Sequence, residues 1–146
     1  MLGIALPFAG ADLLVKSSKP TEAWAYHQRS YTWLLLSVAL FIGLALIVRI
    51  TPLVVALAAG VLAGGLLGNS LSAAWNGMEV PNPLIIVGSR GVVAFNLADV
   101  WVLTGIILLV LSLGFLLVRH RSLIRSTTDV TGLAERLRDS SSTDNR

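Results

Sequence analysis

The chain has 146 residues, of which 55% are hydrophobic and only 13% are charged, and its mean hydropathy is +0.78. A soluble domain carries about 25% charged residues, and a chain this short cannot bury so much apolar surface in water. The composition therefore disfavours a soluble enzyme, a disordered protein and a nucleic-acid-binding domain. There is no cysteine, and the two histidines, His27 and His120, lie far apart. We expect no disulfide, no thiol nucleophile, no metal site and no cofactor.

Four apolar stretches follow one another along the chain and predict an all-α membrane protein with four transmembrane helices. A span needs about 20 apolar residues, with a range of roughly 17–25. The fourth stretch meets this length, the second and third meet it with their interfacial residues, and the first is marginal. We interpret the first as a short spanning helix, since no basic leader precedes it as in a signal peptide. The stretches are Leu2–Val15, Trp33–Val48, Ile50–Leu67 and Val100–Val118.

A tight turn and a ridge of small residues characterise the middle of the chain. Pro52 suits the first turn of a new helix, so the second and third stretches predict a helical hairpin. Small residues then recur at every fourth position on one helix face, which lets two helix backbones approach closely in lipid. No Walker-type lysine follows them, and we therefore expect packing rather than phosphate binding. These residues are Ala56, Gly60, Gly64 and Gly68.

The segment between the third and fourth stretches predicts a small β-hairpin on the outer face. Pro81-Asn82-Pro83 is a helix-breaking cluster, and two β-rich runs then flank the loop Gly88–Gly91 within residues 84–95. Both runs are apolar on both faces, so we expect them to lie against the membrane interface or the helices. We assign residues 1–125 to a transmembrane domain and 126–146 to a polar cytoplasmic tail. A short helix near Leu133–Arg138 is the only regular structure expected in that tail.

Basic residues set the predicted orientation, because cytoplasmic flanks of membrane helices carry an excess of Lys and Arg. With four spans, both termini lie on the same side of the membrane. The side that holds the termini would carry Arg49, Arg119, Arg121, Arg125, Arg136 and Arg138, and the other side Lys16, Lys19, Arg29 and Arg90. This distribution predicts that both termini are cytoplasmic.

Polar residues at the outer ends of the predicted helices are the candidate site. Asp12 and Lys16 are four residues apart, which places them on one helix face and favours an ion pair. Asp99 falls in the first turn of the fourth helix, where the helix dipole favours an acid, and Asn96 is placed as its N-cap. Asn69 is expected to end the third helix on the same side of the membrane. The spacing therefore predicts that Asn69, Asn96 and Asp99 converge, and we expect Ser72 to lie in the same cluster near the outer interface.

Three blocks of the chain resemble the signal peptidase II family of prolipoprotein signal peptidases, which are four-helix membrane aspartic proteases. They are Gly64-Gly65-Leu66-Leu67-Gly68-Asn69 followed by Gly77, Phe95-Asn96-Leu97-Ala98-Asp99, and Asp12-Leu13-Leu14-Val15-Lys16. The resemblance covers about residues 2–120. It implies a bacterial inner-membrane protein whose partners are membrane lipid and a lipoprotein precursor or another membrane protein. It also implies that Asp99 is a catalytic residue and that Asn69, Asn96, Asp12 and Lys16 belong to the binding site.

The chain departs from the family pattern where the chemistry would occur. The first of the family's two catalytic aspartates would fall at Ser72, and the arginine that follows it at Ala73. The family's later Asp-Phe pair would fall near Pro81-Asn82, and its Asn-x-Gly motif in the segment 26–30. Aspartic proteolysis needs two carboxylates that share a proton, and serine supplies none. The resemblance therefore implies a family fold with half of the catalytic pair missing.

Three interpretations of the function remain open. The first is a catalytically impaired relative that binds a lipidated or apolar helical ligand in an outer-leaflet cleft. The second is an active lipoprotein signal peptidase, with Glu79 or Asp12 as the second carboxylate, or with Ser72 as a nucleophile activated by His27. The third is an accessory or scaffold subunit of a membrane complex, in which the glycine ridge and the apolar hairpin contact other proteins.

Overall fold

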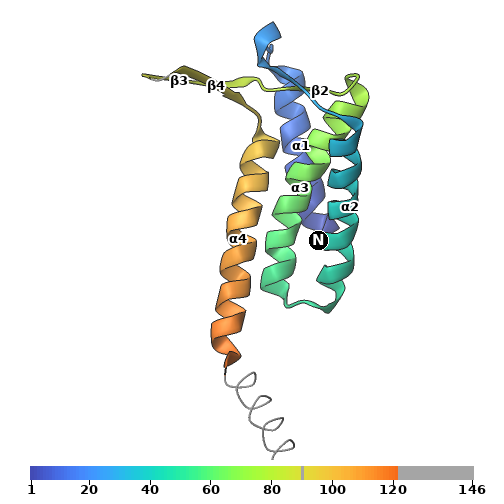
Figure 1. Cartoon of the computed structure of the whole chain (residues 1–146), viewed down its shortest axis with the longest axis vertical. Helices are drawn as coiled ribbons and strands as arrows, with labels where there is room; N and C mark the ends of the chain where they lie inside the picture. Colours follow the sequence, from blue (N-terminus) through green and yellow to red (C-terminus); the bar gives the residue numbers. More distant parts are fainter. Residues whose placement is uncertain (90, 122–146) are drawn as a thin grey trace, which may run out of the picture. The chain divides into compact units, whose positions relative to one another are not determined.

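The computed structural model describes residues 1–89 and 91–121, most of which are helical (Figure 1). The chain divides into two units, Met1–Ser112 and Leu113–Arg146, and the packing described below is that of the first. The predicted tail helix near Leu133–Arg138 and the predicted boundary at residue 125 lie outside the described residues. The α-helices within the described part are α1 (Leu2–Ser18), α2 (Tyr31–Ile47), α3 (Leu53–Trp75) and α4 (Leu97–Arg119).

Three helical segments of the described chain are long and apolar enough to cross a membrane. They are Tyr31–Ile50 with 20 residues and a hydropathy of 2.5, α3 with 23 residues and 1.8, and α4 with 23 residues and 2.7. In an apolar 18-residue window of α3, 61% of the residues are buried within the protein, against 11% in the corresponding window of the segment that contains α2. The lower hydropathy of α3 follows from this position, because its faces contact other helices rather than lipid. The three longer predicted spans are confirmed as apolar helices, and spanning by α1 stays a prediction.

Gly60, Gly64 and Gly68 of the small-residue ridge on α3 pack against α1; close helix packing was predicted for this ridge, and the partner helix was not. A Cβ added to Gly60, Gly64 or Gly68 would lie 2.9, 2.6 and 2.8 Å from its nearest atom on α1. Real Cβ atoms essentially never approach another atom below 3.0 Å, so a side chain at these positions would push the helices apart. The facing residues on α1 recur with the same spacing of four. The pairs are Gly60 with Ile4, Gly64 with Phe8 and Gly68 with Asp12.

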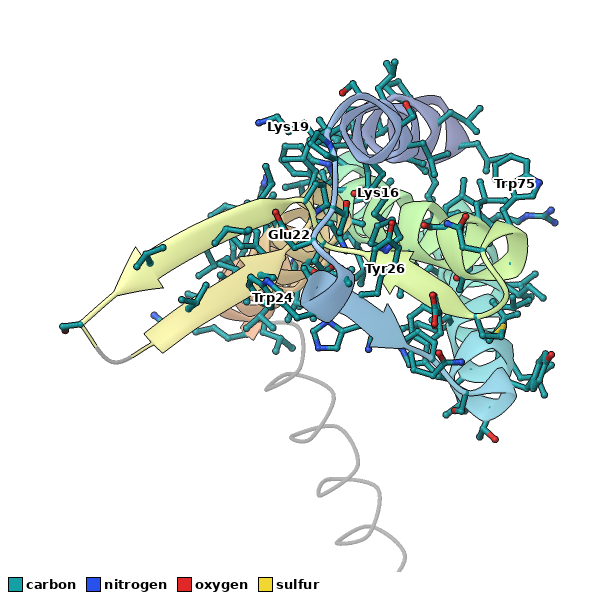
Figure 2. The ribbon with its side chains drawn as sticks, turned by 90° about the horizontal axis from the view of Figure 1, so that it is seen from above. Lys16, Lys19, Glu22, Trp24, Tyr26 and Trp75 are labelled. Carbon is teal, nitrogen blue, oxygen red and sulfur yellow. The ribbon has the colours of Figure 1, made fainter. Side chains whose placement is uncertain are left out.

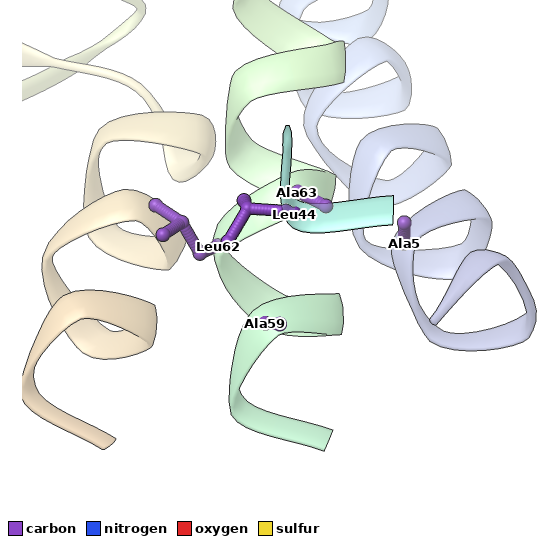
Figure 3. Close-up of a cluster of buried hydrophobic side chains, with 5 residues drawn as sticks. All are labelled: Ala5, Leu44, Ala59, Leu62 and Ala63. Atoms are coloured by element: carbon purple, nitrogen blue, oxygen red, sulfur yellow. The ribbon is translucent and has the colours of Figure 1, made fainter. Parts of the chain in front are cut away.

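A second close approach joins α3 to α4 through Gly65 and Gly105. A Cβ on Gly65 would lie 2.5 Å from the carbonyl oxygen of Ala98, and one on Gly105 would clash with the backbone of Leu62. Figure 3 shows Leu62 directed toward α4 within a cluster of buried apolar side chains. Three of the five members of that cluster are alanines, and the five come from α1, α2 and α3. Such small side chains allow helices to pack closely. Its members are Ala5, Leu44, Ala59, Leu62 and Ala63.

The connection between α2 and α3 is the tight turn that was predicted. A 3-10 turn over Val48–Ile50 follows α2, and Pro52 occupies the position just before the first helical residue of α3. The predicted end of α3 at Asn69 is wrong, because the helix continues through Ser72 to Trp75. Residues 69–75 contain no glycine or proline, and α3 ends only where Gly77 adopts a φ of 63°. Asn69 and Ser72 are therefore both interior helix residues on α3.

The predicted β-hairpin is confirmed as β3 (Leu84–Gly88) and β4 (Gly91–Phe95), which pair antiparallel from Leu84 opposite Phe95 to Gly88 opposite Gly91. It extends away from the helices where α4 begins (Figure 1). Most of its apolar side chains are exposed, and Val87 is 76% accessible, whereas Leu84 and Phe95 near the helices are half-buried. Placement of this hairpin on the outer face of the membrane stays a prediction.

A second pair of strands was not predicted. β1 (Tyr26–Gln28) pairs antiparallel with β2 (Glu79–Pro81), and Tyr26 lies opposite Pro81. Each strand has only three residues, too few for an alternating pattern to be recognised. This pairing fastens the connection between α1 and α2 onto the segment that follows α3, next to the candidate site.

We expect Gly64→Ala to destabilise the protein, whereas Gly43→Ala should not. The Cβ that the first substitution adds on α3 meets Phe8 and the carbonyl oxygen of Ala5, and such overpacking costs about 1–3 kcal/mol. A Cβ at Gly43 in α2 meets nothing within 4 Å, so that variant should gain roughly 0.5–1 kcal/mol of helix propensity. Reversible unfolding in mixed micelles measures both changes. Equal stability of the two variants would contradict the assigned α1–α3 contact.

Candidate polar site at the start of helix α4

The first turn of α4 is closed by two reciprocal hydrogen bonds between Asn96 and Asp99. The backbone N–H of Asp99 donates to Oδ1 of Asn96 at 3.0 Å, and the backbone N–H of Asn96 donates to Oδ2 of Asp99 at 3.2 Å. This is the capping-box arrangement, with Asn as the N-cap and Asp in place of the usual Glu three residues later. The predicted N-cap is confirmed, and Asp99 has a structural role at the helix end.

Asp12 brings a carboxylate from α1 to the same helix end. Its Oδ1 accepts a hydrogen bond from the backbone N–H of Ala98 at 2.8 Å, and its Oδ2 lies 2.6 Å from Nζ of Lys16. The first N–H groups of a helix have no partner within that helix, and the helix dipole favours a negative charge near them. The predicted ion pair is confirmed. Asp12 is fully buried, and its hydrogen bond with the Ala98 amide ties α1 to α4 inside the protein.

Asn69 on α3 completes the connection between the two acids. Nζ of Lys16 donates to Oδ1 of Asn69 at 2.9 Å, and Nδ2 of Asn69 donates to Oδ1 of Asp99 at 2.9 Å. The amide is therefore oriented by a cation on one side and a carboxylate on the other. These contacts bring Asn69, Asn96 and Asp99 together, although Asn69 acts from within α3 rather than from its end.

Ser72 lies one turn beyond Asn69 and faces a pocket. Its Oγ accepts a hydrogen bond from Nδ2 of Asn76 at 3.3 Å, and the residue is only 3% exposed. The pocket has a volume of about 470 Å³, and Asp99 is not among its lining residues. In the view from above, Lys16 and Tyr26 lie near the middle of the molecule and Trp75 at its edge (Figure 2). The lining residues are Gly10, Leu13, Leu14, Lys16, Ser17, Tyr26, Ser72, Trp75, Asn76 and Pro81.

Two further residues of the network were missed by sequence reasoning. Nδ2 of Asn96 donates to Oδ1 of Asn82, and Nδ2 of Asn82 contacts Nδ1 of His27. Asn82 carried a signal only as the centre of a Pro-Asn-Pro turn and as part of the place near which the family's Asp-Phe pair would fall. His27 was considered only as a base for Ser72, whereas its bonded partner is Asn82. Neither spacing nor residue type shows that β1 carries His27 to the start of α4.

The alternatives for a second carboxylate find little support in the geometry. Asp12 has one oxygen on the Ala98 amide and the other on Lys16. Glu79 is exposed and begins β2 opposite Gln28. Within residues 1–89 and 91–121, no three His, Cys, Asp or Glu side chains cluster as a metal site would require.

We expect Asp12→Asn to lower the free energy of unfolding by roughly 3–5 kcal/mol, the usual cost of removing one partner of a buried ion pair. The asparagine can still accept from the Ala98 amide, so the loss comes from leaving Lys16 buried beside a neutral group. The double variant Asp12→Asn with Lys16→Met removes both charges and should recover part of this loss. Unfolding in mixed micelles gives these values. A single variant as stable as the wild type would show that the pair is not buried.

No curated protein matches the chain. A solved bacterial membrane enzyme, determined by the in meso method, resembles it with a TM-score of 0.59 at 18% identity, over 77% of this chain and 85% of that chain, which is a likeness of fold. The model of the signal peptidase II family matches residues 14–115, a range that includes Ser72 and Asp99. The resemblance in the sequence blocks is thereby confirmed, and the chain belongs to the signal peptidase II family.

Proposed function

We propose that this protein binds a lipid-modified or apolar helical ligand in the pocket beside Ser72 and does not cleave it. The observation that carries the proposal is Ser72 itself, which stands where the family pattern has one of its two catalytic aspartates. Its hydroxyl lines the pocket and accepts a hydrogen bond from Asn76. A hydroxyl cannot share a proton with Asp99 as a second carboxylate would, so the concerted step of an aspartic protease lacks one member.

The contacts of Asp99 support the same interpretation. Its two oxygens accept hydrogen bonds from the side chain of Asn69 and from the backbone of Asn96. These bonds close the first turn of α4, so a carboxylate at this position is useful to the fold without any catalysis. Asp12 and Lys16 likewise have structural partners. The polar residues that the chain shares with the family pattern therefore have structural roles that do not require cleavage.

The pocket has the chemistry of a site for an amphiphile. Leu13, Leu14, Trp75 and Pro81 supply apolar surface, and Ser72 belongs to a smaller polar part of the lining. Ligand sites commonly combine apolar walls with a few polar groups that fix orientation. The charge of Lys16 is matched by Asp12, so this lysine does not call for an anionic head group. An acyl chain or an apolar helix carrying a neutral polar group fits these properties.

The proposed location is the bacterial inner membrane, with α1 as the fourth span and both termini in the cytoplasm. α1 has 17 residues and packs along α3, itself long enough to span, from Gly60 to Gly68. Arg49 lies at the α2–α3 turn, and Lys19 and Arg29 flank the connection between α1 and α2. In this orientation the β3–β4 hairpin and the polar site lie toward the outer leaflet.

Single cysteines in this cysteine-free chain test the orientation. We expect a cysteine at Ile50 and one added before Met1 to label from the cytoplasmic side, and a cysteine at Ser89 to label from the outer side. Ile50 is 87% exposed, so its turn is accessible to a membrane-impermeant reagent. Ser37→Cys, which is buried within α2, is the control that should stay unlabelled until the protein is denatured. An N-terminal cysteine that labels from the same side as Ser89 would show that α1 does not span.

The functional test uses purified protein and a diacylglyceryl-modified prolipoprotein peptide. We expect the wild type to bind this peptide and to leave it uncleaved, because loss of one member of a catalytic unit typically costs about 10⁴–10⁶ in rate. Ser72→Asp alone should restore little cleavage, since Ala73 also departs from the family pattern and misplacement by about 1 Å can cost roughly 100-fold. Wild-type turnover that disappears in Asp99→Asn would overturn the non-cleaving proposal.

Two matched glycine variants of α1 test whether the pocket is the binding site. Gly10 lines the pocket and Gly3 does not, and a Cβ meets nothing within 4 Å at either position. Gly10→Leu should therefore fill the pocket and weaken peptide binding at least about tenfold, which is a difference of roughly 1.4 kcal/mol. Gly3→Leu should leave binding unchanged. A wild type that neither binds nor cleaves the peptide, but purifies with a stoichiometric protein partner, would favour an accessory subunit.

A further inference from the structure

We infer that His27 is a positioning residue for the first turn of α4, and that protonation of its ring breaks the side-chain hydrogen bonds through which it acts. The side chain is exposed on β1, and it connects to α4 through two buried asparagines, Asn82 and Asn96. The inference concerns the directions of these hydrogen bonds and does not rest on the proposed function.

We call the chain of side-chain contacts His27–Asn82–Asn96 the relay. The helix backbone at the Asn96 end sets the direction of its hydrogen bonds. The N–H of Asp99 can only donate, so the side-chain atom of Asn96 that meets it at 3.0 Å must be the carbonyl oxygen Oδ1. The amide nitrogen of Asn96 then points away from the helix. It donates to Oδ1 of Asn82 and to the carbonyl oxygen of Pro81.

The same reasoning fixes the next two groups. Asn82 must present its oxygen to Asn96, so its own amide nitrogen faces Nδ1 of His27. An amide nitrogen is a donor, and a ring nitrogen accepts only when it carries no proton. His27 is therefore neutral in this arrangement, with its proton on Nε2.

Protonation of His27 leaves no arrangement of the relay in which every donor has an acceptor. A proton on Nδ1 would face the amide nitrogen of Asn82, which is donor against donor. Turning the Asn82 amide over would satisfy His27 but would place a donor against the amide nitrogen of Asn96. Asn82 and Asn96 are 1% and 0% exposed, so the donor left without an acceptor is a buried one, which costs free energy. The ring of His27 is exposed to protons from the solvent, and the donor that loses its acceptor on protonation belongs to a buried asparagine.

The relay connects this event to the pocket. His27 lies opposite Val80, and Asn82 donates its backbone N–H to the carbonyl oxygen of Ala25, so the relay supplements the short β1–β2 pairing. Tyr26 and Pro81, which are opposite one another in this pairing, both line the pocket. Loss of the side-chain relay therefore loosens the strands that form one wall of the pocket.

The other titratable groups near His27 do not replace the Asn82 contact. They are Tyr26 and Arg29 in and beside β1, Glu79 on β2 and Glu22 before the 3-10 turn Ala23–Ala25, with Asp99, Lys16 and Asp12 beyond the asparagines. The guanidinium of Arg29 lies 4.9 Å from the ring of Trp33, a cation–π contact. In the described part of the chain, no salt bridge reaches His27.

Nitrogen-15 NMR of the two histidine rings in micelles tests the assignment directly. Nδ1 of His120 lies 3.0 Å from the carbonyl oxygen of Leu116, an acceptor, so the neutral ring of His120 should carry its proton on Nδ1. His27 should show the opposite tautomer, with its proton on Nε2. The spectrum of His27→Asn assigns the signals. A His27 ring that carries its proton on Nδ1 at pH 7.5 would overturn the inference.

A pair of variants separates the relay from a general effect of pH. Protonation of the His27 ring should lower the wild-type melting temperature by about 3 °C, the loss expected for one hydrogen bond, and melting curves recorded at pH 7.5 and in acid measure this fall. In His27→Asn the new amide oxygen takes the place of Nδ1 and does not titrate. That variant should keep the wild-type value at pH 7.5 and lose the fall. His27→Gln, whose oxygen lies near Nε2 instead, should be less stable at both values. Identical pH profiles for the wild type and His27→Asn would overturn the inference.

Discussion

The carboxylate of Asp12 is the point at which helices α1, α3 and α4 of this protein are joined. It neutralises the buried ammonium of Lys16 and accepts the free backbone N–H of Ala98 at the start of α4. A buried charge is stable only when it is paired and hydrogen-bonded, so each of these groups constrains the others. Gly68 on α3 is part of the same constraint, because a Cβ there would lie 2.8 Å from Oδ2 of Asp12. The close helix packing and the polar cluster therefore depend on each other.

The parts of the structure that the sequence could predict are those determined by nearby residues. The three longer apolar helices, the turn before Pro52, the hairpin around Gly88–Gly91 and the Asn96 cap all follow from local spacing or composition. The ion pair of Asp12 with Lys16 follows from one turn of helix. Convergence of Asn69 with Asp99 was also predictable, because the segment between α3 and α4 returns the chain to the end of the helices that it left.

The remaining parts depend on contacts between distant segments. The extension of α3 to Trp75 could not be predicted from apolar content, since Asn69, Ser70 and Ser72 interrupt it. Neither Gly65 nor Gly105 belongs to a recognisable local pattern. Their role, which is to allow the close approach of α3 and α4, is seen only when the two helices are placed together. His27 lies 55 residues from Asn82, and only the β1–β2 pairing brings the two into contact. No local pattern contains that information.

The spacing of the α1–α3 contact has a consequence for the uniqueness of the fold. Ile4, Phe8 and Asp12 recur every four residues, and so do the glycines that receive them. Sliding α1 by one such step, about 6 Å along the axis, would place Ile4 on Gly64 and Phe8 on Gly68. The equally spaced glycines on α3 would accept α1 in either alignment, so close packing alone does not determine the register of the two helices. The slipped alignment would, however, carry the Asp12 carboxylate away from the Ala98 amide and remove the hydrogen bond between them. A single acidic side chain thus favours one of these two alignments of α1 over the other.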